Sequence, residues 1–188
     1  MQIKKDDIRA KILQVSERMF IKNGYENTSL RMISDRSYIS KSNIYRYFSS
    51  KEEIYETLVS SARDDLKKAI EFFASGDYAG KYTPDKVVEI SEMLAKVISK
   101  NRSGMLIMLN AKESADQEMI KEMMRKQFIE ACPIDDTEFK SQIVNLLIVA
   151  FTDILLKHED EEEIKERLRL LWYYHYMGLD GVKNKLGV

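Results

Sequence analysis

The sequence predicts an all-α protein, and three observations lead to that prediction. The 188 residues include two prolines and seven glycines, which break the chain rarely. Between these breaks, apolar residues recur at helical spacing. Hydrophobic residues make up 44% of the chain, and charged residues of both signs make up 32%. Such a composition is typical of amphipathic helices that surround an apolar core.

The first three expected helices are short or medium in length. Asp6 or Asp7 caps the first helix, and Gly24 ends it in the left-handed conformation. A second helix begins at Thr28 and a third follows Ser40. The apolar residues at helical spacing that face inward are Ile8, Ile12, Val15, Met19, Leu30, Ile33, Ile44 and Phe48.

A longer fourth helix is expected to leave this N-terminal unit. Ser50 and Glu53 form an S-x-x-E capping box, and an apolar stripe continues from there to about Phe73. Thr83 and Pro84 start a fifth helix with proline at its permitted first position, and Gly104 ends it. The remaining helices are expected over residues 105–112, 115–131, 136–156 and 164–177.

Charge is sorted along the chain. Residues 1–51 contain 11 Lys/Arg and 5 Asp/Glu, a balance of +6, whereas residues 52–188 contain 19 and 26, a balance of −7. A basic N-terminal unit on an acidic body indicates that one end of the molecule meets a polyanion.

Several classes of function are disfavoured. Cys132 is the single cysteine and the chain has two histidines, so neither a metal site nor an intrachain disulfide is expected. No nucleophile with a nearby base, H-E-x-x-H motif or glycine-rich phosphate loop is present, so neither an enzyme nor a bound cofactor is expected. The longest apolar run, residues 146–151, is too short to span a bilayer, which predicts a cytoplasmic protein with no membrane partner.

The stretch from Thr28 to Phe48 has the dimensions of a helix-turn-helix. Because Ile44 and Phe48 define the buried side of its second helix, Ser42, Asn43 and Arg46 lie on the opposite side. Arginine can bond the O6 and N7 atoms of guanine, and asparagine can bond the N6 and N7 atoms of adenine. Asn43 and Arg46 are therefore predicted to read bases in double-stranded DNA.

Other side chains around this face suit phosphate contacts. Tyr45 and Tyr47 lie on its flanks, where hydroxyl groups meet the walls of the groove. Thr28 lies at the start of the first helix of the motif, and Lys41 and Lys51 lie at the two ends of the reading unit.

These residues resemble the DNA-binding domain of TetR-family regulators. The resemblance covers about the first 55 residues, and its Y-x-Y-F-x-x-K ending is the most specific part. It is carried by Ile12, Leu13, Phe20, Gly24, Tyr25, Thr28, Ser29 and the run from Ser40 to Glu53.

The resemblance implies a fold of about nine helices and an Ω-shaped homodimer with a small-molecule pocket in its C-terminal body. It divides the chain into a DNA-binding domain over residues 1–51, with the helix-turn-helix at about 28–48, and an effector-binding and dimerisation domain over 52–188. It assigns DNA contacts to Thr28, Lys41, Ser42, Asn43, Tyr45, Tyr47 and Lys51. Arg46 occupies a variable position of the family motif, so its role rests on the helix geometry.

The sequence departs from the family pattern at three positions. Ser34 stands where alanine is usual, Tyr38 where the turn usually has glycine, and Ser42 where a small residue is usual. A bulky residue at positive φ is strained. Tyr38 is therefore expected either to relax the turn or to pack against the body.

The body is expected to bind an apolar or amphipathic effector and to form the dimer. Helices over 136–156 and 164–177 carry more apolar surface than one face can bury, so they are expected to pair with a second copy. Glu89, Glu92 and Glu113 are weaker candidates for binding a cationic ligand. The candidate pocket residues are Met93, Met105, Met108, Phe128 and Trp172, although stripes of this kind more often form plain core.

The predicted function is therefore that of a dimeric regulator of transcription. As a repressor, it would bind a palindromic operator and be released by a small molecule. The alternative is a helical ligand-binding or protein-interaction module whose DNA binding is impaired, with Tyr38 as the residue responsible.

Overall fold

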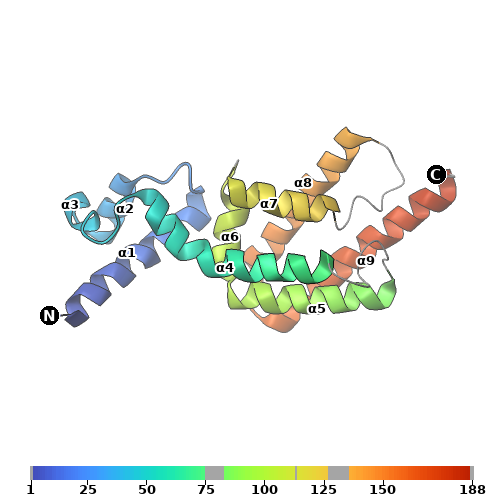
Figure 1. Cartoon of the computed structure of the whole chain (residues 1–188), viewed down its shortest axis with the longest axis horizontal. Helices are drawn as coiled ribbons and strands as arrows, with labels where there is room; N and C mark the ends of the chain where they lie inside the picture. The colour runs from blue at the N-terminus through green and yellow to red at the C-terminus, as the bar shows by residue number, and fades with distance from the viewer. Residues whose placement is uncertain (1, 75–82, 113, 127–135, 187–188) are drawn as a thin grey trace.

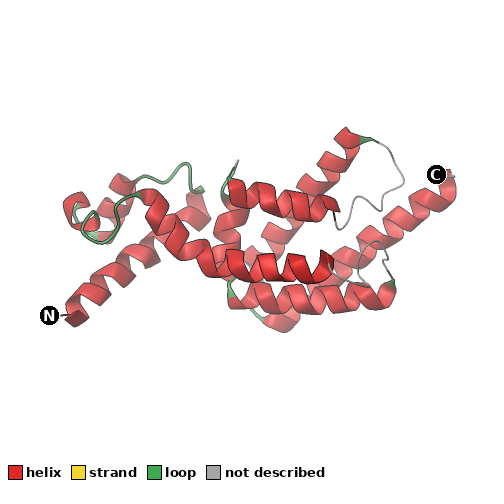
Figure 2. Cartoon of the chain, in the orientation of Figure 1, coloured by secondary structure: helices red, strands yellow, loops and turns green. Residues whose placement is uncertain are grey.

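The computed structural model describes residues 2–74, 83–112, 114–126 and 136–186, and those residues form nine helices and no strand (Figure 2). The all-α prediction is confirmed. In Figure 1 the first three helices form a head at one end of an elongated molecule, and α5 to α9 form a body. Helix α4 runs from the head into the body.

The head consists of α1 (Gln2–Asn23), α2 (Leu30–Ser37) and α3 (Lys41–Ile44). Helix α1 begins before Asp6 and Asp7, so the predicted cap is wrong. Its predicted end is confirmed, because Gly24 follows it at φ +83°. This is the left-handed conformation that glycine adopts without steric cost.

Helix α4 (Lys51–Ala74) starts at the predicted capping box. The amide of Glu53 donates to Ser50 Oγ at 3.2 Å, while the Glu53 carboxylate accepts from the amide and hydroxyl of Ser49 at 2.6 Å each. The carboxylate thus reaches one residue further back than the ideal box predicts. These hydrogen bonds from Ser49 hold the pKa of Glu53 below its ordinary value.

The body helices lie against one another in a bundle whose core is shared with α4. Helix α9 packs along α5, and α6 crosses α4 and also contacts α1 and α8. The Thr83 hydroxyl accepts from the amide of Lys86 at 3.4 Å, which confirms the predicted start of α5. The five helices are α5 (Pro84–Lys100), α6 (Arg102–Asn110), α7 (Ala115–Met124), α8 (Thr137–Lys157) and α9 (Glu161–Leu186).

Two predicted helix ends are wrong. Helix α5 ends at Lys100, and Gly104 lies inside α6 rather than between helices. Helix α9 continues through Gly178 to Leu186. A glycine inside a helix costs only about 1 kcal/mol, which neighbouring turns can offset. The predicted end of the helix over 115–131 lies outside the described residues.

Gly104 marks the closest approach of α6 to α4. A Cβ atom at this position would lie 2.8 Å from Ala62 Cβ and 3.1 Å from the Leu58 carbonyl oxygen. The second of these atoms belongs to the backbone, which cannot rotate away. The absence of a side chain at Gly104 is therefore what lets the two helices touch.

Replacing Gly104 with alanine is expected to destabilise the fold by about 1–2 kcal/mol, because overpacking outweighs the gain in helix propensity. Gly178→Ala is the matched control, since a Cβ there meets nothing within 4 Å. That control is expected to leave stability unchanged or raise it by up to about 1 kcal/mol. Urea unfolding measures both, and equal stabilities would contradict the close crossing.

Helix α8 is unusually apolar for a helix with so much exposed surface. An 18-residue window within Thr137–Lys157 has a mean hydropathy of 1.6, and 28% of that window is buried in the chain. By length and composition alone, this helix could cross a membrane. The uninterrupted apolar run, residues 146–151, is much shorter than this window and does not reveal its hydropathy. The exposed apolar face of α8 requires a partner of some kind.

Candidate nucleic-acid interface

The helix-turn-helix unit is built from two capped helices. Ser29 Oγ accepts from the amide of Met32 at 3.2 Å and caps α2, and Ser40 Oγ accepts from the amide of Asn43 at 3.3 Å and caps α3. Helix α2 thus begins two residues after Thr28, the predicted start. Serine favours such positions because its hydroxyl satisfies an amide that the helix leaves unpaired.

Helix α3 is short, and hydrogen-bonded turns extend it. The Tyr45 amide donates to the Lys41 carbonyl at 3.0 Å, and the Phe48 amide donates to the Ile44 carbonyl at 3.0 Å. Ile44 and Phe48 are 0% and 1% exposed, as the spacing predicts. This burial holds one side of the unit against the core of the head.

The opposite side of this unit is polar and open. Lys41, Ser42, Tyr45 and Arg46 are exposed, whereas Asn43 and Tyr47 are half-buried. The arrangement presents hydrogen-bonding side chains on a firm support, which is what reading the major groove requires. Their individual DNA contacts remain predictions.

Two other predicted DNA contacts have partners inside the head. Thr28 is 1% exposed, and its hydroxyl donates to the Gly24 carbonyl at 2.8 Å. Lys51 Nζ donates to the Tyr25 carbonyl at 2.8 Å and lies 3.9 Å from the centre of the Tyr25 ring. Both side chains hold the connection between α1 and α2, a role that sequence reasoning missed.

Tyr38 was expected either to relax the turn or to pack against the body, and it does neither. It adopts the left-handed conformation at φ 57° and ψ 31°, so the turn is not relaxed, and it is 92% exposed, so the ring does not pack on the body. Its amide and that of Ile39 donate to the Ser34 carbonyl. Tyrosine therefore carries the backbone strain that the usual glycine avoids.

Replacing Tyr38 with glycine is expected to stabilise the protein by about 0.5–1 kcal/mol, because relief of strain exceeds the entropy cost of glycine. Tyr38→Ala removes the same ring and keeps the left-handed penalty, so it should bring no such gain. Thermal unfolding compares the two. Equal stability of the glycine and alanine variants would show that the turn is not strained.

The body contains an apolar cavity of about 30 Å³ between α4 and α9. Of the candidate pocket residues, Met105 and Trp172 line this cavity and Met93 and Met108 do not, while Phe128 lies outside the described residues. Glu89 and Glu92 are exposed and do not line it, and Glu113 is not described. The lining residues are Leu66, Ile90, Leu94, Ile98, Met105, Leu109, Ile120, Met123, Met124, Phe151 and Trp172.

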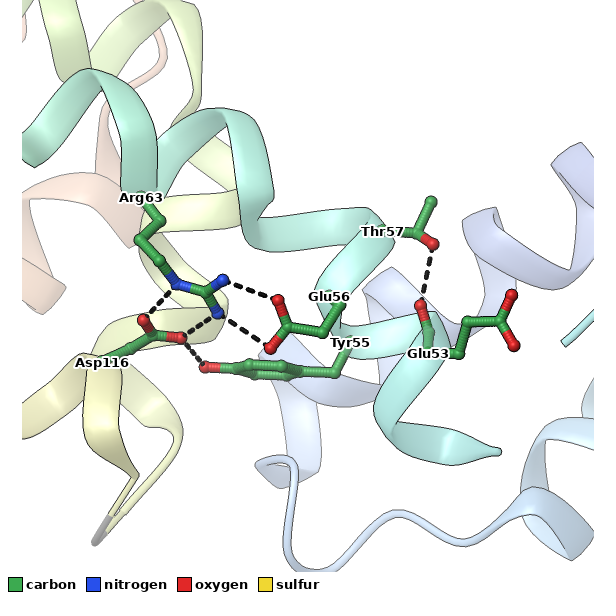
Figure 3. A network of polar contacts seen from close by, with 6 residues as sticks. All are labelled: Glu53, Tyr55, Glu56, Thr57, Arg63 and Asp116. Carbon is green, nitrogen blue, oxygen red and sulfur yellow. Dashed lines mark hydrogen bonds and ion pairs between the residues drawn. The ribbon is translucent and has the colours of Figure 1, made fainter. Parts of the chain in front are cut away.

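A buried polar cluster joins α4 to α7 beside this cavity, and sequence reasoning missed it. Asp116 on α7 accepts hydrogen bonds from Tyr55 and Arg63 on α4 (Figure 3). Asp116 resembles an ordinary acidic residue in the first turn of a helix. Its partners lie 53 and 61 residues away, so no local pattern could reveal them.

Comparisons with known proteins agree on the head and on the fold. Residues 12–58 match the model described as bacterial regulatory proteins, tetR family. The chain is 31% identical over 61 residues to the uncharacterized HTH-type transcriptional regulator YfiR of Bacillus subtilis, covering 32% of this chain and 30% of that protein. It is 29% identical over 69 residues to the HTH-type transcriptional activator FasR of Mycolicibacterium smegmatis, covering 37% of this chain and 32% of that protein.

The matched segments thus span about a third of these relatives. A solved TetR-family transcriptional regulator from Bordetella parapertussis shares the fold over almost the whole chain. Its TM-score is 0.59 at 19% identity, with 92% of this chain and 97% of that chain covered. Residues 12–58 are thus similar to the tetR family of bacterial regulatory proteins, and the chain as a whole shares the fold of a solved TetR-family regulator.

Proposed function

We propose that the protein is a cytoplasmic, ligand-responsive repressor that binds a palindromic operator as a homodimer. One observation carries the proposal. The side of α3 and the following turn that holds Ser42 and Arg46 is polar and exposed, whereas Ile44 and Phe48 on the opposite side are buried in the head. Residues 1–51 serve as the DNA-binding domain, with the motif at about 28–48, and residues 52–188 serve as the effector and dimer domain.

The dimer is supported by two exposed apolar stripes. On α8, Leu146, Val149 and Leu156 are 61%, 65% and 50% exposed. On α9, Tyr174 and Met177 are 81% and 59% exposed. A second copy placed by a twofold axis would bury both stripes in a four-helix bundle. These stripes fall within the segments 136–156 and 164–177 predicted from sequence.

Dimerisation also supplies the specificity that one recognition helix lacks. Two copies of α3 in successive major grooves stand about 34–36 Å apart, so the operator has two inverted half-sites. Asn43 and Arg46 read bases, and Lys41, Ser42, Tyr45 and Tyr47 contact the backbone or the groove walls. Thr28 and Lys51 support this surface and approach phosphates at its edge.

The effector is apolar or amphipathic, because the cavity is lined by aliphatic, methionine and aromatic side chains. Its volume of about 30 Å³ is far below the roughly 300–1,000 Å³ of ordinary ligand pockets. Binding therefore requires the surrounding helices to separate. An effector that favours the separated state weakens DNA binding by its differential affinity for the two states.

Selection of bound sequences from a random duplex pool tests the DNA-binding part. The expected product is an inverted repeat, and affinity for it should fall with salt at a log–log slope of about −0.9 per phosphate neutralised. A single half-site would contradict the dimer. No enrichment at any salt concentration would favour the alternative, an interaction module with impaired DNA binding.

Repression is tested by transcription in vitro from a promoter that carries the selected operator. The purified dimer is expected to lower transcript yield, and Arg46→Ala at equal concentration should not. A rise in transcript with the wild-type protein would instead identify an activator.

A further inference from the structure

The polar cluster between α4 and α7 is centred on Asp116, whose side chain is 7% exposed. Its carboxylate accepts from Arg63 Nε at 2.5 Å, Arg63 Nη2 at 2.7 Å and the Tyr55 hydroxyl at 2.7 Å (Figure 3). Arg63 also donates to both carboxylate oxygens of Glu56, at 2.6 and 3.0 Å. One α7 carboxylate is therefore held by three donors from α4.

Electrostatics keep the Asp116 carboxylate of this cluster ionised. Burial alone would raise the pKa of Asp116, yet the hydrogen bonds from Arg63 and Tyr55 hold it below the ordinary value. Burial and the hydrogen bond to Asp116 raise the pKa of Tyr55. A buried ion pair with this bidentate geometry fixes orientation, whereas an apolar contact of the same area lets two helices slide.

The cluster is connected to the head through Tyr55. The ring of Tyr55 lies 4.8 Å from that of Tyr25, which belongs to the connection between α1 and α2. The Tyr25 hydroxyl donates to Glu52 at 2.9 Å, and Lys51 donates to the Tyr25 carbonyl. Tyr55, one of the two α4 residues that meet Asp116, thus also meets the loop that precedes the recognition unit.

The cluster is connected to the cavity through both of its helices. Ile120, four residues after Asp116 on α7, lines the cavity, and so does Leu66, three residues after Arg63 on α4. Helix α7 otherwise packs mainly on α6 and α8. Any ligand that separates α7 from α4 at the cavity wall acts directly on the Asp116 contacts.

From this placement we infer that Asp116 is the positioning residue that sets the pose of α4 and the head relative to the body. Its contacts with Tyr55 and Arg63 hold the DNA-competent arrangement, and expansion of the cavity breaks them. Helix α6 also links the head to the body, through hydrogen bonds from Ser103 to Glu17 at 2.9 Å and from Asn110 to the Ile21 carbonyl at 3.5 Å. These contacts remain as the pivot about which the released head turns. The link from Asp116 to DNA binding rests on the proposed function. The role of Asp116 in positioning the head is independent of that function.

The first test needs neither DNA nor a dimer. Spin labels at Asp35→Cys on α2 and Lys96→Cys on α5, in a Cys132→Ser background diluted with unlabelled protein, report the distance between head and body. Asp116→Asn, which keeps the shape and removes the charge, is expected to broaden or shift the distance distribution. An unchanged distribution in folded protein would overturn the inference.

The control is Asp65→Asn, which removes another carboxylate of α4. Asp65 accepts from Lys100 at 2.7 Å and from Asn101 at 2.8 Å, and neither partner belongs to α7. This variant should leave the distance distribution unchanged. If both variants broaden it equally, the effect is general loosening and the special role of Asp116 is wrong.

The second test uses operators whose half-site separation differs by single base pairs. The wild-type protein is expected to prefer one separation, and Asp116→Asn is expected to reduce that preference by about 5-fold or more, the lower end of ordinary allosteric coupling. A merely structural residue would lower stability without changing the preferred separation. Failure of the wild-type protein to bind any selected operator would count against the proposed function alone, because the distance measurement still decides the role of Asp116.

Discussion

Replacing Val149 with aspartate is expected to convert the protein from a dimer to a monomer and to weaken operator binding by about a hundredfold or more. Val149 is 65% exposed in the middle of the α8 stripe. In a twofold interface the change occurs in both copies, so two carboxylates would be buried. Burying an unpaired charge costs several kcal/mol, which exceeds the roughly 2.7 kcal/mol that a hundredfold loss requires.

Sedimentation velocity at micromolar concentration measures the first effect, and fluorescence anisotropy with labelled operator measures the second. Ser60→Asp places the same carboxylate on an exposed position of α4 and should remain dimeric. If Val149→Asp sediments as a dimer beside this control, then α8 does not supply the interface and its apolar face has another partner.

Local sequence signals explain which parts of the fold were predictable. Gly24 ends a helix, and Ser40 and Thr83 each cap the start of one. Each acts on backbone groups within four residues of itself and lies where the sequence pattern predicts. Helix interiors with a repeated apolar face were equally clear. Such features depend on sterics and hydrogen bonds that the rest of the molecule changes little.

Features that depend on distant neighbours were not predictable. Gly104 looked like a helix end, but it lies where α4 approaches within reach of its missing Cβ. Tyr38 looked like an obstacle to the turn, yet the bonds to the Ser34 carbonyl hold the turn in place around it. A tertiary contact decides the outcome at Gly104, and hydrogen bonds within five residues decide it at Tyr38. In both cases the competing conformations differ in local cost by only about 1–2 kcal/mol.

The same division holds at the candidate interface. Ile44 and Phe48 are buried as their spacing predicts, so the polar side of α3 could be assigned from the sequence. The internal hydrogen bonds of Thr28 and Lys51 could not be predicted from the sequence, because a threonine and a lysine at those positions suit a phosphate contact equally well. The Asp116 cluster is the extreme case, since it joins residues from two helices more than 50 positions apart.

Replacing Arg46 with alanine is expected to lower operator affinity strongly and to relax specificity at one position of each half-site. Arg46 is exposed on the reading side, opposite Ile44 and Phe48. A bidentate contact with guanine contributes about 1–3 kcal/mol. Two such contacts in a dimer make the expected loss about 2–6 kcal/mol, or roughly 30-fold to more than 10,000-fold.

Lys41→Ala is the matched comparison, because Lys41 is also exposed and lies at the start of the same helix. Loss of a phosphate contact weakens binding to all sequences about equally and reduces the salt slope by about 1 for each half-site. The Arg46→Ala variant should instead distinguish less between operators that differ at one base pair, and its affinity should keep most of its dependence on salt. Anisotropy titrations on single-substitution operators at several salt concentrations separate the two patterns. If Arg46→Ala lowers all affinities evenly and flattens the salt dependence, then Arg46 binds phosphate, and base reading falls to Asn43 and Ser42.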